Sequence, residues 1–205
     1  MLAFGTVATD TLELLRRITA LPQFAHTRLV GGTALALQFG HRKSIDLDFF
    51  GMLSSDPEET QEDLEALGTI KVIKQTHNIR IYMLDGVKID IVDYSRFPWL
   101  DDPISEDGVR LATAKDIAAM KVNAIEGRGS RKDFVDIYFL LQHYSLAEIL
   151  SFYQAKYPDH SVFRALMSLT YFDDAEAQPM PEMLSEISWK QMKTTINNAV
   201  KHHRQ

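Results

Sequence analysis

The sequence predicts an α+β fold, with short strands in the N-terminal half and helices in the C-terminal half. Residue alternation typical of strands dominates residues 27–94, and helical periodicity runs from Thr113 onward. Between them, residues 97–103 hold two prolines and two adjacent aspartates, which is typical of a surface crossing. We therefore expect two domains, residues 1–100 and 101–205: a mixed β-sheet with flanking helices, then a helical bundle, with the active-site cleft between them.

In the N-terminal half the pattern predicts helices at residues 10–19, 34–38 and 57–66, and strands at 28–30 and 45–50. The clearest local signal is a pair of alternating runs, 79–84 and 87–92, separated only by Asp85-Gly86. A two-residue Asp-Gly connection favours a type I′ hairpin, because both turn residues need positive φ.

In the C-terminal half, hydroxyl residues precede two helical runs. Thr113 is expected to cap a helix through residue 125, and Ser130 one through residue 144, with Asp116 and Asp133 in capping-box positions. Further helices are expected at 145–157, 161–170 and 189–202.

Composition narrows the class of protein. The chain has 205 residues, 45% hydrophobic and 24% charged, enough to bury a core. It has no cysteine, which excludes disulfides, thiolate zinc sites and a cysteine nucleophile. It shows neither a signal peptide nor an apolar run long enough to span a membrane, so we expect a soluble, cytoplasmic protein with no membrane partner. A net charge of −6 argues against general electrostatic attraction to nucleic acid.

Residues 29–51 combine groups that suit phosphate and metal chemistry. The pair Gly31-Gly32 lets the backbone approach an anion, and the helix that follows directs free N–H groups at it. Asp46 and Asp48, two apart on a strand, project from one face and suit a hard cation that also binds substrate phosphates. Asp90 lies mid-strand in the hairpin, and it would join them if its strand lay beside theirs.

The glycine pair, the Asp-x-Asp strand and the later strand aspartate resemble the DNA polymerase β-like nucleotidyltransferase superfamily. The fuller pattern resembles the AbiEii/AbiGii nucleotidyltransferase toxin family over residues 29–189; it consists of GGTALAL, HRKSIDLDFF, KDIAAMKVNAIEGRGSRKDFVDIYFLL and YFDDAEAQPMP. The resemblance implies a metal-dependent enzyme that moves a nucleoside monophosphate group from an NTP to a hydroxyl acceptor, with Mg²⁺ or Mn²⁺ as cofactor.

The resemblance also implies roles for individual residues. Lys121 would hold the triphosphate and Asp133 would complete the active site, with Arg128 and Asp136 nearby in the same Lys…Arg…Lys-Asp-x-x-Asp motif. Asp90 is the least certain metal ligand. The remaining positions of the first motif, which would bind nucleotide or metal, are Gly32, Thr33, Arg42, Ser44, Asp46 and Asp48.

Periodicity gives these residues alternative readings. Lys121 falls within the apolar arc of its helix, so it needs an anionic partner or must extend its amine to solvent. Asp133 serves equally well as a capping residue. Asp90 could instead pair with Arg80 or Lys88 within the hairpin.

The biological setting follows from the resemblance alone: the toxin of a toxin–antitoxin or phage-defence pair, with a cognate antitoxin and with tRNA as the acceptor. Because the chain is acidic overall, a tRNA-binding face must concentrate its bases. Two clusters qualify: Arg128, Arg131 and Lys132, and the tail residues Lys190, Lys193, Lys201 and Arg204. A non-catalytic nucleotide-binding module and a small-molecule (antibiotic-type) nucleotidyltransferase are the alternatives.

Overall fold

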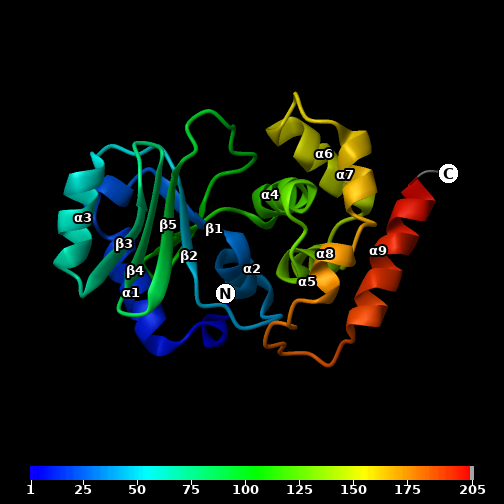
Figure 1. The fold of residues 1–205 in the computed structure, drawn as a ribbon, viewed down its shortest axis with the longest axis horizontal. Coiled ribbons are helices and arrows are strands. Elements are labelled where there is room, and N and C mark those ends of the chain that lie inside the picture. The colour runs from blue at the N-terminus through cyan, green and yellow to red at the C-terminus, as the bar shows by residue number, and fades with distance from the viewer. Residues whose placement is uncertain (204–205) are drawn as a thin grey trace. The chain divides into compact units, whose positions relative to one another are not determined.

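The computed structural model describes residues 1–203, and the chain forms two compact units (Figure 1). The sheet unit comprises Met1–Gly40, Ser44–Pro98 and Asp102–Ala112. The helical unit comprises His41–Lys43, Trp99–Asp101 and the chain from Thr113 onward. Each unit is therefore built from discontinuous stretches of sequence.

The described residues of the sheet unit form a seven-stranded mixed sheet in the order β3-β4-β5-β2-β1-β7-β6. The strands are β1 (Thr27–Val30), β2 (Leu47–Gly51), β3 (Ile70–Gln75), β4 (Ile79–Leu84), β5 (Val87–Asp93), β6 (Ile104–Glu106) and β7 (Val109–Leu111). β2 is antiparallel to β1 and parallel to β5, and β7 is parallel to β1. The predicted α+β class and mixed sheet are confirmed.

The two faces of β2 differ in chemistry because successive side chains point to opposite sides of a sheet. Leu47 and Phe49 are buried on one face, where the Phe49 ring packs 5.1 Å from that of Phe24. Asp48 points to the other face and is the register partner of Asp90 on β5. The apolar core and the aspartates thus occupy opposite faces of the same strands.

Three helices complete the sheet unit: α1 (Thr9–Thr19), α2 (Gly31–Phe39) and α3 (Pro57–Glu65). In Figure 1, α3 lies against the outer strands β3 and β4. The buried guanidinium of Arg80 on β4 holds the start of α3, donating to the carbonyls of Ser55 (2.6 Å) and Asp56 (3.3 Å). Burial lowers the pKa of Arg80, but the side chain serves as an anchor for α3 and does not pair with Asp90.

The Asp-Gly hairpin is confirmed, with Asp85 at φ 47° and Gly86 at φ 85°. A second hairpin of the same type, which the sequence analysis missed, joins β6 to β7 through Asp107 (φ 52°) and Gly108 (φ 76°). Each of its strands has three residues, too few for alternation to show. Because this hairpin pairs with β1, the sheet unit extends to Ala112, beyond the border expected at residue 100.

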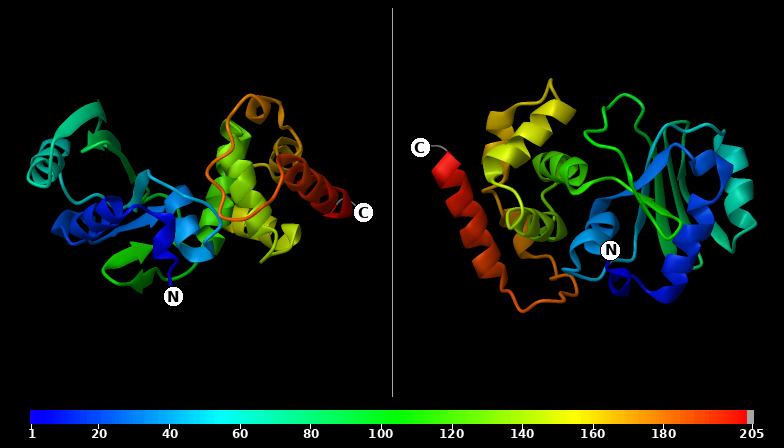
Figure 2. Two further views of the ribbon diagram at one scale, coloured as in Figure 1. Left: turned by 90° about the horizontal axis from the view of Figure 1, so that it is seen from below. Right: turned by 180° about the vertical axis from the view of Figure 1, so that it is seen from behind.

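The described part of the helical unit contains α4 (Ala114–Gly127), α5 (Arg131–Leu140), α6 (Leu146–Lys156), α7 (Val162–Ser168), α8 (Asp173–Glu176) and α9 (Trp189–His203). α4 packs on α5, α6 and α7, and α9 runs along α5 and α6 (Figure 2). The helix expected through residue 144 ends at Leu140 and continues as turns. Among residues 1–203, no helix is long and apolar enough to cross a membrane.

A buried ion pair explains why residues 99–101 belong to the helical unit. Lys156 and Asp116 are both fully buried, and Lys156 Nζ lies 2.7 Å from Asp116 Oδ1. The same oxygen accepts the backbone N–H of Leu100 at 3.0 Å, and Lys156 Nζ lies 4.5 Å from the centre of the Trp99 ring. Asp116, expected only as a capping residue, also ties the connecting segment to α4 and α6.

Candidate active site

The start of α2 is built around a close approach between backbone and carboxylate. Gly31 has φ 68°, and a Cβ at this position would lie 2.2 Å from Asp48 Oδ2. No other residue type fits there without displacing Asp48, because a side chain would meet both backbone strain and a collision. The glycine that directly follows β1 therefore lets the carboxylate of Asp48 lie against the first turn of α2.

Thr33 and Ser44 organise the segment that leads into β2. Thr33, in the first turn of α2, is 1% exposed, and its hydroxyl donates to the backbone carbonyl of Asp46. Thr33 Oγ1 also hydrogen-bonds Ser44 Oγ at 2.8 Å. Gly32, beside Thr33, is half-buried. Thr33 and Ser44 thus fix the backbone that carries Asp46.

The three predicted metal ligands lie on the same side of the sheet unit's central strands. Asp46 precedes β2 by one residue, and Asp48 is its second residue, so their side chains leave the backbone in the same direction. β2 and β5 are neighbours, and Asp48 and Asp90 are opposite one another in register. All three aspartates are half-buried.

Asp90 also carries a counter-ion from its own strand. Lys88 Nζ lies 2.6 Å from each carboxylate oxygen and donates its hydrogen bond to Oδ2. The other oxygen, Oδ1, is buried and accepts no hydrogen bond, but it is engaged in the ion pair with the same ammonium. Of the two pairings weighed from the sequence, the structure forms the one with Lys88.

Within residues 1–203, no group of three or more His, Cys, Asp or Glu side chains is arranged to hold a metal ion. Asp46, Asp48 and Asp90 are therefore not arranged as a three-carboxylate cage. Mg²⁺ is commonly held by one or two carboxylates together with waters and substrate phosphates. Asp48 with Asp46 or Asp90, and the buried Oδ1 of Asp90, fit that smaller donor set.

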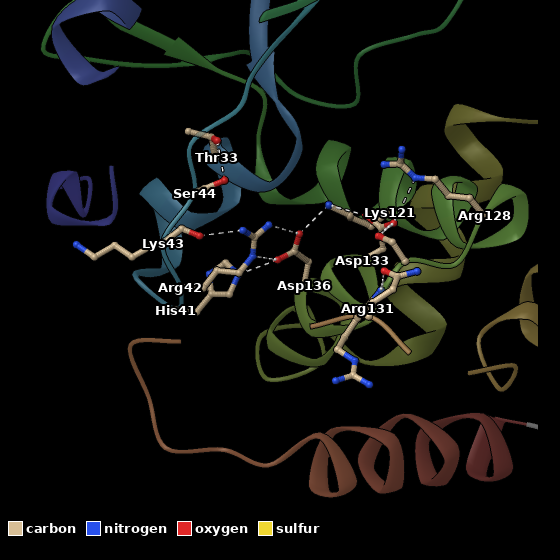
Figure 3. Close-up of polar contacts among 12 residues, drawn as sticks. Thr33, His41, Arg42, Lys43, Ser44, Lys121, Arg128, Arg131, Asp133 and Asp136 are labelled. Carbon is tan, nitrogen blue, oxygen red and sulfur yellow. Dashed lines mark hydrogen bonds and ion pairs between the residues drawn. The ribbon is translucent and has the colours of Figure 1, made fainter. Parts of the chain in front are cut away.

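The helical unit contains a second polar site, centred on the fully buried Asp136 of α5 (Figure 3). Arg42 donates to both carboxylate oxygens, from Nε at 2.8 Å and from Nη2 at 3.0 Å. His41 Nε2 lies 2.9 Å from Oδ1, and Lys121 Nζ lies 2.7 Å from Oδ2. Two cations and an imidazole therefore converge on one carboxylate.

Lys121 has the anionic partners that its inward position requires. Its ammonium lies between Asp136 and Asp133, 2.9 Å from Asp133 Oδ1, and only 9% of its side chain is exposed. Asp133 is further held by the hydroxyl of Ser130 at 2.5 Å. Ser130 thus precedes α5 as expected, but its hydroxyl donates to Asp133 and does not cap the backbone.

These contacts shift the pKa values of Asp136, Asp133 and Lys121. Burial alone raises the pKa of Asp136, but Lys121 and Arg42 hold it well below its ordinary value. The pKa of Asp133 is also lowered, because Lys121 and the Ser130 hydroxyl outweigh the effect of burial. Burial lowers the pKa of Lys121, and the two carboxylates more than reverse this. The contacts therefore favour the charged forms of Asp133, Asp136 and Lys121.

Arg42, Lys121 and Asp133 are predicted as site residues from the sequence. Asp136 is matched only as a neighbouring position of the same helical motif, and neither it nor His41 is given a role in the site. Asp136 follows Asp133 by three residues, so both lie on one face of α5. A second aspartate at this spacing inside an apolar run was the available signal. His41 begins the HRKSIDLDFF motif, but its partner lies 95 positions away in the chain and could not be identified from that motif.

The first predicted basic cluster is only partly exposed. Arg131 donates to the carbonyls of Ala175 (2.9 Å) and Glu176 (2.6 Å), and its guanidinium lies 4.9 Å from the centre of the Trp189 ring. Arg131 is thus a structural link between α5, α8 and α9. Arg128, with 74% of its side chain exposed, and Lys132 remain on the surface.

In the second cluster, Lys190 and Lys201 are exposed, whereas Lys193 pairs with Glu176. Arg204 lies outside the described residues.

Solved structures with the same architecture define the class. JHP933 from Helicobacter pylori superposes with a TM-score of 0.60 at 18% identity, covering 96% of this chain and 92% of that one. The nucleotidyltransferase toxin MenT4 of Mycobacterium tuberculosis H37Rv gives a TM-score of 0.60 at 12% identity, covering 94% and 80%. The chain has a nucleotidyltransferase fold.

Sequence comparison identifies the family. The family model described as "Nucleotidyl transferase AbiEii toxin, Type IV TA system" matches residues 13–203. The uncharacterized protein aq_aa25 of Aquifex aeolicus (strain VF5) is 32% identical over 197 residues, 93% of this chain and 94% of that protein. The chain belongs to the AbiEii nucleotidyl transferase toxin family, as its motifs predict.

Proposed function

We propose that this protein transfers a nucleoside monophosphate group from an NTP to a hydroxyl acceptor, with a divalent cation. The observation that carries the proposal is the contact between Gly31 and Asp48. It brings a carboxylate to the N-terminal turn of α2, where free backbone N–H groups attract phosphate. The closeness of Asp48 to this turn supports a site that binds a phosphate and a divalent cation together, as nucleotide chemistry requires.

The proposed roles follow from the position of each residue. Asp46 and Asp48 bind the cation, and Asp90 contributes through its buried Oδ1. Gly32 and the first turn of α2 bind the nucleotide phosphates, and Thr33 holds the segment that carries Asp46. Asp46 and Asp48 would hold a divalent cation beside the phosphates, and that cation would supply positive charge against the negative charge of the departing pyrophosphate.

The helical unit contributes Lys121 and its partners to this proposal. Lys121 is held in the charged form by Asp133 and Asp136, and the role we propose for it, holding a phosphate of the NTP, follows from the family motif. Asp133 is the candidate for orienting the acceptor hydroxyl. Arg42 has a more structural role than Lys121, because its guanidinium donates from both Nε and Nη2 to the carboxylate of Asp136.

The direct test is transfer from radiolabelled NTPs with Mg²⁺, offered separately to tRNA, protein and small hydroxyl acceptors. Asp46→Ala and Asp48→Asn are expected to abolish labelling. Asp10→Asn, at an exposed position on α1, is the matched control and should label normally. Equal labelling by wild type and Asp46→Ala would end the proposal. Mg-NTP binding that survives Asp46→Ala/Asp48→Ala, without turnover, would favour the non-catalytic module.

For the acceptor we propose tRNA, read by exposed bases of the helical unit. With Arg131 engaged inside the unit, Arg128 and Lys132 are the residues to test. Arg128→Glu/Lys132→Glu should weaken tRNA labelling while leaving NTP binding intact. Labelling of tRNA should also fall with salt, by roughly 0.7–0.9 log units of affinity per phosphate contact per decade. Labelling that is indifferent to salt and to both substitutions would point to a small-molecule acceptor.

Membership of a toxin family leads us to propose a growth-inhibiting activity and a cognate antitoxin as partner. Expression of the chain alone should slow growth, and Asp48→Ala should restore it. Normal growth at high expression of the folded wild-type protein would count against the toxin role.

A further inference from the structure

We propose that Lys88 is a built-in competitor of the divalent cation: its ammonium neutralises Asp90 in the metal-free protein and must leave when the cation binds. The inference rests on the proposed function for the existence of the cation. It concerns a residue with no expected part in phosphate or metal binding.

The ammonium of Lys88 occupies the position that a cation bound to Asp90 would take. Lys88 Nζ lies 2.6 Å from both oxygens of Asp90, in the place where a cation bound by this carboxylate would approach. Two positive charges cannot share that position, because they repel strongly at such distances. Binding of a divalent cation to Asp90 therefore requires the ion pair to open.

A positive charge beside Asp90 offsets a repulsion between two neighbouring carboxylates. Asp48 and Asp90 are register partners on adjacent strands, which are about 4.8 Å apart in a β-sheet. Like charges directly opposite one another destabilise a sheet. Without a metal ion, the ammonium of Lys88 offsets this repulsion, and a bound divalent cation would do the same more strongly.

The side chain of Lys88 can move away from Asp90 into solvent. Its side chain is 38% exposed and extends along its own strand, two residues before Asp90 on the same face. A displaced ammonium can enter solvent without being buried unpaired. This distinguishes Lys88 from Lys121, whose side chain is 9% exposed and held by two carboxylates.

The experiment measures binding of Mn²⁺ alone to the full chain, by calorimetry and by the loss of the free-ion electron paramagnetic resonance signal. Lys88→Met keeps the length of the aliphatic stem and removes the charge. It should tighten Mn²⁺ binding about fivefold, since opening the Lys88–Asp90 pair no longer opposes the cation. Lys88→Gln should tighten it similarly, and circular dichroism will show that both variants are folded.

Two controls separate this effect from a general change in charge. Lys71→Met makes the same charge change on exposed β3, two strands from Lys88, and should alter affinity less than twofold. The double variant Lys88→Met/Asp90→Asn should not bind Mn²⁺ more tightly than wild type, because the carboxylate that pairs with Lys88 has been removed.

The outcomes are distinct. If wild type binds Mn²⁺ and neither Lys88 variant binds it more tightly, the Lys88 inference is wrong while the metal site stands. A gain that survives in Lys88→Met/Asp90→Asn also overturns it. If neither wild type nor Lys88→Met binds Mn²⁺, the metal part of the proposed function fails and the inference fails with it. Binding by Lys88→Met alone would be the strongest support.

Discussion

Replacing Asp136 by asparagine is expected to destabilise the helical unit severely. Asp136 is fully buried and accepts from Arg42 at 2.8 and 3.0 Å, with Lys121 Nζ at 2.7 Å. Asparagine keeps the size of the side chain but leaves both cations without their shared anion. Removing one partner of a buried ion pair costs about 3–5 kcal/mol, because the remaining charge stays buried. For a chain of this length that corresponds to a fall of roughly 6–20 °C in Tm.

The assay is denaturant and thermal unfolding followed by the helical circular dichroism signal at neutral pH. Asp101→Asn is the matched control, since Asp101 is also paired with a lysine of the helical unit but is 39% exposed. Its loss of stability should be a small fraction of that of Asp136→Asn, because solvent screens exposed pairs. If the two variants lose the same stability, the buried cluster does not stabilise the fold in the way described.

Three further predictions follow from other contacts. Gly31→Ala should lower Tm more than Gly86→Ala: both glycines have positive φ, but only at Gly31 would the new Cβ meet a carboxylate, and equal losses would contradict this. Because the pKa of Asp136 is depressed on folding, its stabilisation is complete above the ordinary carboxyl pKa of about 3.9 and is lost as pH falls toward the lower folded value. Acid titration should therefore be steeper for wild type than for Asp136→Asn, and parallel curves would refute the assignment. Arg131→Ala should speed hydrogen exchange in α8, whereas Arg128→Ala, at an exposed position, should leave it unchanged.

Much of the local structure could be predicted from the sequence, because local signals determine it. The Asp85-Gly86 turn needs positive φ at both residues, and alternation on either side needs no other part of the chain. The burial of Lys121 was likewise predictable from the periodicity of α4 alone. What these patterns could not supply is the identity of partners distant in sequence.

The limits of prediction are clearest in the buried cluster and in β7. Arg42 pairs with Asp136, which lies 94 positions away in the sequence. The residues around either one do not indicate that the other is its partner. β7 has three residues and is placed by its parallel register with β1, through Leu29 and Leu111. The same Asp-Gly turn that was recognised at residue 85 recurs at Asp107, but its short strands gave no alternation to support it.

The discontinuous make-up of the two units has a consequence for synthesis on the ribosome. The segment His41–Lys43 leaves the ribosome long before α5, yet the guanidinium of Arg42 pairs with Asp136 of that helix. The sheet unit, for its part, is incomplete until Asp102–Ala112 has emerged. Domains usually fold in the order in which they are made. Here the early segment must wait for a late helix. A cut at residue 100 would take Asp102–Ala112 from the sheet unit and His41–Lys43 from the helical unit, whereas a cut at residue 112 would leave the sheet unit whole and deprive only the helical unit.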